Sequence, residues 1–170
     1  MKILETERTI LREVVETDAE FILDLLNQPS FIKYIGDRNV RTIEEAHDYI
    51  ETRFTNSYRQ FGFGMWAVES KESGKPMGVC GFVKRDSLPD ADIGFAFLPQ
   101  FEKKGYAFES AAAAMKYGEE VLKLPRVLAI TSKDNFSSQK LLDKIGLKFE
   151  RLISLPADPE ELKLFSTDNR

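Results

Sequence analysis

The feature that most constrains the fold is a strand, a glycine turn and a helix in direct succession. Residues 91–97 (ADIGFAF) are typical of a short buried strand, and residues 108–122 (FESAAAAMKYGEEVL) of an amphipathic helix. The turn between them carries Lys103, Lys104 and Gly105. Backbone N–H groups in a first helical turn lack partners within the helix and carry partial positive charge, and a glycine lets an anion approach closely. With its two lysines, this turn predicts a phosphate site.

The turn does not match the common nucleotide-binding motifs. The chain contains no Gly-x-x-x-x-Gly-Lys-Ser/Thr sequence, and no Gly-x-Gly-x-x-Gly opens a helix. Glycine turns between a strand and a helix are common in α/β proteins, so the phosphate site needs support from a second motif.

That second motif begins about thirty residues further along the chain, the usual length of a βαβ unit. Residues 126–131 (RVLAIT) predict a strand, and a helix follows with Asn135 as its N-cap and Gly146 at its end. The apolar face of this helix consists of Leu141, Leu142 and Ile145.

Together, the two segments resemble the GNAT superfamily of N-acetyltransferases, in the branch that includes the ribosomal-protein N-terminal acetyltransferases. In that family the turn reads Gln/Arg-x-x-Gly-x-Gly/Ala, often as Lys-Gly-Tyr-Ala-x-Glu-Ala, and this chain has Lys-Gly-Tyr-Ala-Phe-Glu-Ser at residues 104–110. The family's later signature, Asn-x-x-Ser-x-x-Leu-(x)-x-Lys-x-Gly-Phe, corresponds to residues 135–147. Both motifs follow the expected strands, and the resemblance extends over residues 6–166.

The resemblance implies an α/β (α+β) fold for a single domain, residues 1–170, with the element order β-α-α-β-β-β-α-β-α-β-β. The sheet would be mixed and mostly antiparallel, with splayed central parallel strands flanked by helices. The other elements that the sequence predicts are a strand at 8–15, a helix from Thr17 to near Pro29, a short apolar segment at 31–36, a helix from the capping box at 42–45 to about Tyr58, strands at 65–69 and 77–83, a loop at 86–90, and closing strands at 148–152 and 162–166.

Composition excludes several other classes of function. At 170 residues, with 42% hydrophobic and 31% charged residues, the chain is typical of one globular domain. A net charge of −4 argues against nucleic acid as a partner. The chain has no apolar run long enough for a membrane span and no apolar signal-peptide core, so we expect a cytoplasmic protein. One cysteine and one histidine leave no internal disulfide and no basis for a metal site.

The reaction implied by the resemblance is transfer of an acetyl group from acetyl-CoA to a primary amine, on a protein N-terminus or a small molecule, by direct attack in a ternary complex. The cofactor pyrophosphate would lie on the turn formed by Lys103, Lys104, Gly105, Tyr106 and Ala107. The pantetheine would run between the strands at 93–98 and 127–131, and the oxyanion donor would be the backbone N–H of Phe97 or Leu98. In relatives, side chains at the positions of Asn135 and Ser138 face the cofactor. Homodimers are frequent among relatives, so a homodimer is expected.

Proton transfer is the least defined part of the predicted site. A protonated amine must lose a proton before attack, and a carboxylate, acting directly or through water, is the usual acceptor. Asp92 is the first candidate for this base and Glu13 the second. Many relatives protonate the thiolate with a tyrosine where this chain has Leu142, which leaves Ser138 or water as the proton donor. Glu102 is a further departure, because the family has Gln or Arg there.

Two alternatives stay open on the sequence alone. Leu142 in place of the tyrosine is compatible with a non-catalytic acyl-CoA-binding sensor or regulator, and a fortuitous phosphate turn on an unrelated α/β domain is the other alternative. His47 is interpreted as an exposed helical residue, and Cys80 as a buried core thiol. The segment at 31–36 and the helix after it are expected to determine the acceptor, which the sequence does not identify.

Overall fold

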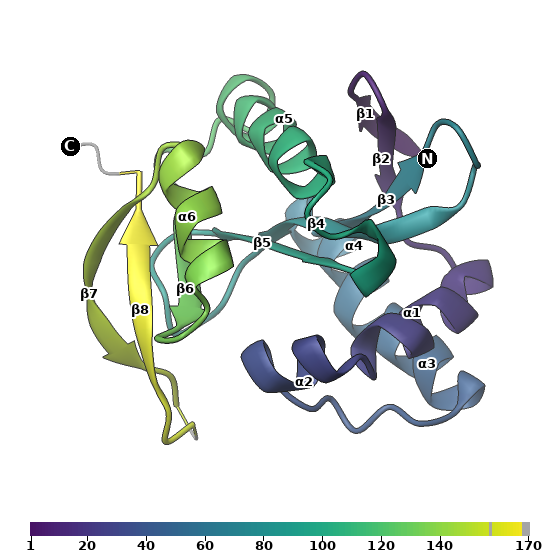
Figure 1. The fold of residues 1–170 in the computed structure, drawn as a ribbon, viewed down its shortest axis with the longest axis horizontal. Coiled ribbons are helices and arrows are strands. Elements are labelled where there is room, and N and C mark those ends of the chain that lie inside the picture. The colour runs from purple at the N-terminus through teal and green to yellow at the C-terminus, as the bar shows by residue number, and fades with distance from the viewer. Residues whose placement is uncertain (157, 168–170) are drawn as a thin grey trace.

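The computed structural model describes residues 1–156 and 158–167, so residues 157 and 168–170 of the predicted domain lie outside it. Eight strands form one sheet in the order β1-β2-β3-β4-β5-β6-β8-β7, and every neighbouring pair is antiparallel except β5 and β6 (Figure 1). The strands are β1 Lys2–Glu5, β2 Thr9–Glu13, β3 Met65–Ser70, β4 Pro76–Val83, β5 Asp92–Phe97, β6 Leu128–Ser132, β7 Lys148–Ser154 and β8 Glu161–Ser166. The helices are α1 Ala19–Leu26, α2 Pro29–Tyr34, α3 Ile43–Tyr49, α4 Asn56–Phe61, α5 Tyr106–Glu120 and α6 Phe136–Lys144.

The predicted fold class is confirmed, including the splay of the central parallel strands. The β5–β6 ladder consists of the single pair Asp92 and Leu128, where the Leu128 N–H donates to the Ala91 carbonyl at 2.9 Å. Beyond that pair the two strands diverge (Figure 1). Each stays in register with its outer neighbour, β5 with β4 and β6 with β8, so the gap opens between two supported strands.

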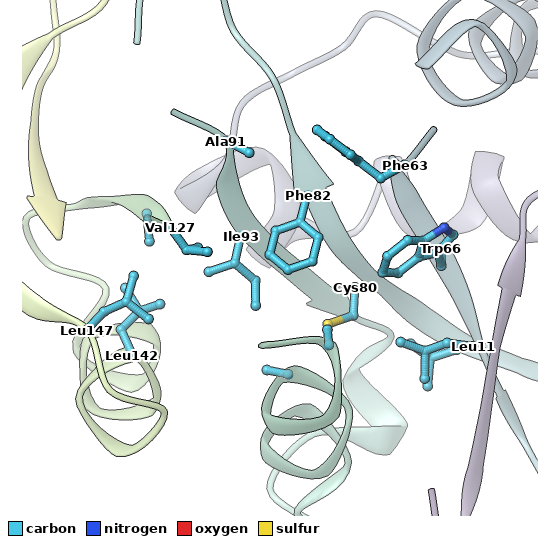
Figure 2. Packing of buried hydrophobic residues seen from close by; sticks show 14 of the residues in the cluster. Leu11, Phe63, Trp66, Cys80, Phe82, Ala91, Ile93, Val127, Leu142 and Leu147 are labelled. Carbon is cyan, nitrogen blue, oxygen red and sulfur yellow. The ribbon is translucent and has the colours of Figure 1, made fainter. Parts of the chain in front are cut away.

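The helices form layers on the two faces of the sheet, with α1–α4 on one face and α5 and α6 on the other (Figure 1). On the α5 face, Trp66 packs edge to face on Phe82 and on Tyr117, with ring centroids 6.0 Å and 5.7 Å apart. Figure 2 shows Trp66, Phe82, Cys80 and Leu11 in this core. Cys80 is fully buried, which confirms its interpretation as a core thiol. Among the described residues, no helix is long and apolar enough to cross a membrane.

The structure adds elements that the sequence did not predict. β1 pairs with β2 at the edge of the sheet, where a four-residue strand shows too little alternation to be recognised. The segment at 31–36 lies largely in α2, which begins at Pro29 because proline is tolerated in the first turn of a helix.

The predicted second helix is present but longer and interrupted. Thr42 caps α3 by accepting the Glu45 N–H at 3.1 Å, as predicted, while the Glu45 carboxylate accepts the Arg41 N–H at 2.7 Å. A π-helical segment, Ile50–Thr55, joins α3 to α4, so the helical run extends to Phe61 rather than Tyr58.

Tyr58 on α4 ties the helical layer to the sheet. Its hydroxyl accepts the Val14 N–H at 2.9 Å and donates to the Met65 carbonyl. These two backbone groups lie just after β2 and at the start of β3. Burial raises the pKa of Tyr58 above its ordinary value, so the hydroxyl stays protonated and able to donate.

Replacing Tyr58 with phenylalanine is expected to lower the free energy of unfolding by about 1–3 kcal/mol, because it leaves the two backbone groups without their partner. Thermal or urea unfolding measures the loss. Tyr117→Phe is the matched control, because Tyr117 contributes its ring to the core and its hydroxyl has no hydrogen bond within the described part of the chain. Equal stability losses in the two variants would contradict the role of the Tyr58 hydroxyl.

Candidate active site

A cleft of about 1720 Å³ opens where β5 and β6 diverge. It is lined from the α5 face by the turn before α5 and the start of α6, and from the opposite face by α2 and the π-helical segment. Because residues of both helical layers line one cavity, the cleft reaches through the sheet. Two ligands can therefore meet inside it from opposite faces.

The predicted phosphate turn lies at one side of this cleft. Gly105 adopts a left-handed conformation with φ of +86° and serves as the N-cap of α5. The first bond of the helix runs from the Glu109 N–H to the Gly105 carbonyl at 3.0 Å, so the N–H groups of Tyr106 and Ala107 precede it. Lys103 and Lys104 are exposed beside them. The geometry of the turn is therefore that of an anion site.

Arg8 is a third cation at this turn, and no pattern in the sequence indicated it. Its guanidinium donates to the Glu109 carboxylate at 2.7 Å and to the Lys104 carbonyl at 3.1 Å, and lies 4.2 Å from the centre of the Tyr106 ring. Partial burial acts to raise the pKa of Glu109, but hydrogen bonds from Thr6 and Arg8 hold it below its ordinary value. Arg8 thus fixes the turn to the β1–β2 hairpin and balances the charge of Glu109.

Of the two N–H groups predicted as oxyanion donors, only one faces the cleft from β5. The Leu98 N–H donates to the Met77 carbonyl at 2.9 Å, so it is engaged with the strand on the other side. In an antiparallel ladder the bonds alternate between the two sides of a strand, so the N–H of Phe97 points toward β6 and the cleft. Phe97 is the remaining candidate.

Asn135, Ser138 and Thr131 line the other side of the cleft. The Asn135 carboxamide oxygen accepts the Ser138 N–H at 3.4 Å, so Asn135 is the N-cap of α6, as predicted. Thr131 on β6 was not singled out from the sequence. It is 8% exposed, and its hydroxyl is buried with no hydrogen-bond partner among the described residues. A buried hydroxyl without a partner is uncommon, and a ligand in the cleft would supply one.

Asp92 lies at the apex of the cleft, where β5 and β6 still pair. It is 2% exposed, and its two carboxylate oxygens lie 3.2 and 3.4 Å from Nε of Arg85. Burial raises the pKa of Asp92 to about 6, and Arg85 opposes the rise. Asp92 and Phe97 are five residues apart, about 16 Å along an extended strand, so Asp92 cannot directly contact an amine held at Phe97.

Glu13 and His47 do not belong to the described lining of the cleft. Glu13 ends β2 opposite Trp66, and His47 lies on α3, where it is half-buried rather than exposed as predicted. The structure therefore does not bring Glu13 together with the other predicted site residues. Leu142 is 1% exposed and packs in the core beneath α6.

A hydrogen bond joins the end of β6 to the end of α2. The Ser132 hydroxyl at the end of β6 donates to the Tyr34 carbonyl at the end of α2, at 3.0 Å. The two residues are 98 positions apart in the chain. This contact places the end of α2 beside the end of β6 (Figure 1).

Comparison with known proteins identifies the fold and the family. Residues 8–148 match the family model described as an acetyltransferase (GNAT) domain. An uncharacterized N-acetyltransferase of Bacillus subtilis, YoaA, is 32% identical over 152 residues, which cover 89% of this chain and 85% of that protein. The [Ribosomal protein uS5]-alanine N-acetyltransferase of Escherichia coli is 27% identical over 159 residues, covering 86% of this chain and 78% of that protein.

Solved structures show the same fold at lower identity. An acetyltransferase from Agrobacterium tumefaciens superposes with a TM-score of 0.82 at 23% identity, covering 99% of this chain and 95% of that one. RimL, a ribosomal L7/L12 alpha-N-protein acetyltransferase whose structure is a complex with coenzyme A, superposes with a TM-score of 0.83 at 17% identity, covering 99% and 100%.

The titration of Asp92 predicts a pH-dependent stability. Because its pKa is raised to about 6, the folded state holds the proton more tightly than the unfolded chain. The resulting stabilisation is complete below about pH 4 and is lost as the pH rises through about 6, by up to roughly 3 kcal/mol. In Asp92→Asn this loss is expected to disappear. Urea unfolding of both proteins between pH 4 and pH 7 measures the difference in their free energies of unfolding, and a constant difference would contradict the assignment.

Proposed function

This chain belongs to the GNAT family of acetyltransferases, and from that premise we propose that it transfers an acetyl group from acetyl-CoA to a primary amine, by direct attack within a ternary complex. The observation that carries the proposal is the cleft between β5 and β6, which is lined by the turn before α5 on one face and by α2 and the π-helical segment on the other. Such a cleft can hold a phosphorylated cosubstrate and an amine at the same time.

The residues of the cleft fit coenzyme A in three respects. The α5 turn offers unbonded N–H groups and two lysines for the pyrophosphate. A β-carbon at Gly105 would lie 3.2 Å from Nη2 of Arg8, so the glycine keeps the turn open. The unpartnered hydroxyl of Thr131 and the free edge of β5 offer hydrogen bonds to the amides of a pantetheine arm. The complex of RimL with coenzyme A supports this assignment, since the two chains share the fold.

Acetyl-CoA would supply a thioester that is already activated toward amines. The Phe97 N–H would then donate to the carbonyl oxygen as negative charge develops there, and one preorganised donor of this kind contributes about 3 kcal/mol. Ser138 is proposed as the group that hydrogen-bonds the departing thiolate. Asp92 would act on the amine only through intervening water, because of its distance from Phe97.

The amine acceptor is proposed to enter from the α2 side, because the α5 face is taken by the phosphate turn. The E. coli relative is named as an alanine N-acetyltransferase of ribosomal protein uS5. That name supports a protein N-terminus as one acceptor class, and a small-molecule amine is the other.

A second candidate function is acyl-CoA binding without turnover, as a sensor or regulator. The observation that favours it is Leu142, which packs in the core where many relatives are expected to have a tyrosine that protonates the thiolate. A coenzyme A thiolate is a fair leaving group without such help, so the enzyme remains the leading proposal.

Thermal melting followed by thiol release tests the two functions together. A hundredfold excess of acetyl-CoA over its Kd is expected to stabilise the protein by about 2.7 kcal/mol, which corresponds to a rise in Tm of about 5–10 °C. Thiol release is expected only when a suitable amine from a panel of N-terminal peptides and small amines is present. A shift with no turnover on any amine would favour the sensor, and no shift would contradict both functions.

Substitutions at Gly105 test where coenzyme A binds. Gly105→Glu and Gly105→Gln both force a side chain into the left-handed conformation, so both are expected to lose a similar 1–2 kcal/mol or so of stability. Glutamate also adds a negative charge beside the pyrophosphate, so its affinity for coenzyme A is expected to be roughly tenfold below that of the glutamine variant. Isothermal titration calorimetry measures both. Affinities equal to that of the unsubstituted protein would move the phosphate site away from this turn.

A further inference from the structure

The arginines of this chain divide into two groups by their partners. Among the residues that the structure describes, seven arginines form an ion pair with a carboxylate: Arg8, Arg12, Arg41, Arg59, Arg85, Arg126 and Arg151. In that same part of the chain, Arg38 and Arg53 have no carboxylate within 4.0 Å, and both line the cleft. The unpaired guanidinium groups thus coincide with the candidate active site.

Arg38 lies in the loop after α2, half-buried at the edge of the cleft. Its Nε is buried and, within the described residues, has no hydrogen-bond partner. A β-carbon at Gly36 would lie 3.2 Å from its Nη1, so the adjoining backbone packs closely on the guanidinium. An unpaired buried donor of a charged group costs free energy, and a negatively charged ligand would remove that cost.

Arg53 lies on the π-helical segment between α3 and α4, and its guanidinium carbon is 5.6 Å from the centre of the Tyr49 ring. Tyr49 and Tyr34 also line the cleft. Single turns of π-helix are often found at functional sites, because they re-aim side chains relative to an α-helix. Here the π-helical segment places the Arg53 guanidinium, which has no paired carboxylate among the described residues, on the side of the cleft formed by α1–α4.

These two arginines are not placed to hold the cofactor phosphates. They belong to the layer of α1–α4, whereas the phosphate turn precedes α5 on the other face of the sheet (Figure 1). The carboxylates that line the cleft come from other elements: Glu102 before α5, Asp86 and Asp92 around the β4–β5 loop, Asp134 and Asp143 around α6, and Asp158 and Glu160 before β8. The helical wall therefore presents positive charge to the side from which the acceptor enters.

We infer that Arg38 and Arg53 recognise a carboxylate carried by the amine acceptor. The inference rests on the proposed function, since it specifies the acceptor class of the same site. A guanidinium presents a planar fork of donors that matches a carboxylate, and such charge-assisted bonds are stronger than neutral ones. The carboxylate is either the α-carboxylate of a free amino acid or an acidic side chain next to the N-terminus of a peptide.

Calorimetric titration in the presence of coenzyme A tests the inference without requiring turnover. One set of probes pairs common α-amino acids with their carboxamides, and a second pairs amidated N-terminal peptides that carry glutamate or glutamine at the second position. The carboxylate member of a pair is expected to bind roughly 10- to 100-fold more tightly than its neutral partner. A preference in the first set would identify the acceptor as a free amino acid, and a preference in the second set would identify it as a peptide.

Variants assign the preference to residues. Arg38→Gln, Arg53→Gln and the double variant are expected to reduce the preference for the carboxylate while leaving the affinity for coenzyme A unchanged. Arg59→Gln is the matched control, because Arg59 lies on the adjoining helix, pairs with Glu51 at 2.7 Å and does not belong to the lining of the cleft. Thermal melting confirms that each variant is folded.

The outcomes separate this inference from the proposed function. No carboxylate preference in either set, or a preference that survives in the double variant, would overturn the inference. Acetyl transfer to amines without that preference would overturn the inference and leave the proposed function standing. A preference that depends on the two arginines, with no acetyl transfer to the same probes, would support the inference as a description of the binding site and contradict the proposed enzymatic function.

Discussion

The single ladder pair between Asp92 and Leu128 is the constraint on which the rest of the site depends. Because β5 and β6 meet only there, the inner edge of β5 keeps free N–H groups while its outer edge stays bonded to β4. The outer ladders hold each strand in place, so the gap between them does not close. An open sheet edge inside a protein is normally covered or paired, and a ligand with its own amides can take the place of the missing strand.

Polar contacts between distant segments then determine what surrounds the opening. Arg8 connects the N-terminal hairpin to Lys104 and Glu109 at the phosphate turn, and the Ser132 hydroxyl connects β6 to the end of α2. Each contact joins residues more than ninety positions apart. The first shapes the side of the cleft where phosphates would lie, and the second shapes the side where an acceptor would enter. Contacts between distant segments thus shape both sides of the cleft, and β5 and β6 define only the space between those sides.

This division explains how much the sequence could predict. The Gly105 turn and the Asn135 cap are visible in local patterns, because a left-handed turn and a helix start each require particular residues nearby in the chain. The order of the strands was instead implied by the family resemblance that these two motifs carry. Arg8 and Thr131 belong to no such pattern. Only the fold shows that Arg8 reaches the turn before α5 and that the Thr131 hydroxyl has no hydrogen-bond partner among the described residues. The same holds for Leu98, whose N–H could be excluded as an oxyanion donor only once its bond to Met77 was known.

The placement of charge and nucleophiles favours direct transfer over a covalent acetyl-enzyme. Burial raises the pKa of Cys80 to about 12, and its thiol lies in the core with Trp66 and Phe82 rather than in the cleft, so it is neither ionised nor accessible (Figure 2). Ser138 lines the cleft, but its hydroxyl has no hydrogen bond, among residues 1–156 and 158–167, to a base that would activate it. The cations of the cleft, by contrast, lie on both of its faces, Lys103 beside α5 and Arg38 after α2. A site with a cation on each face and, among the described residues, no activated nucleophile is suited to hold both substrates at once and let one attack the other.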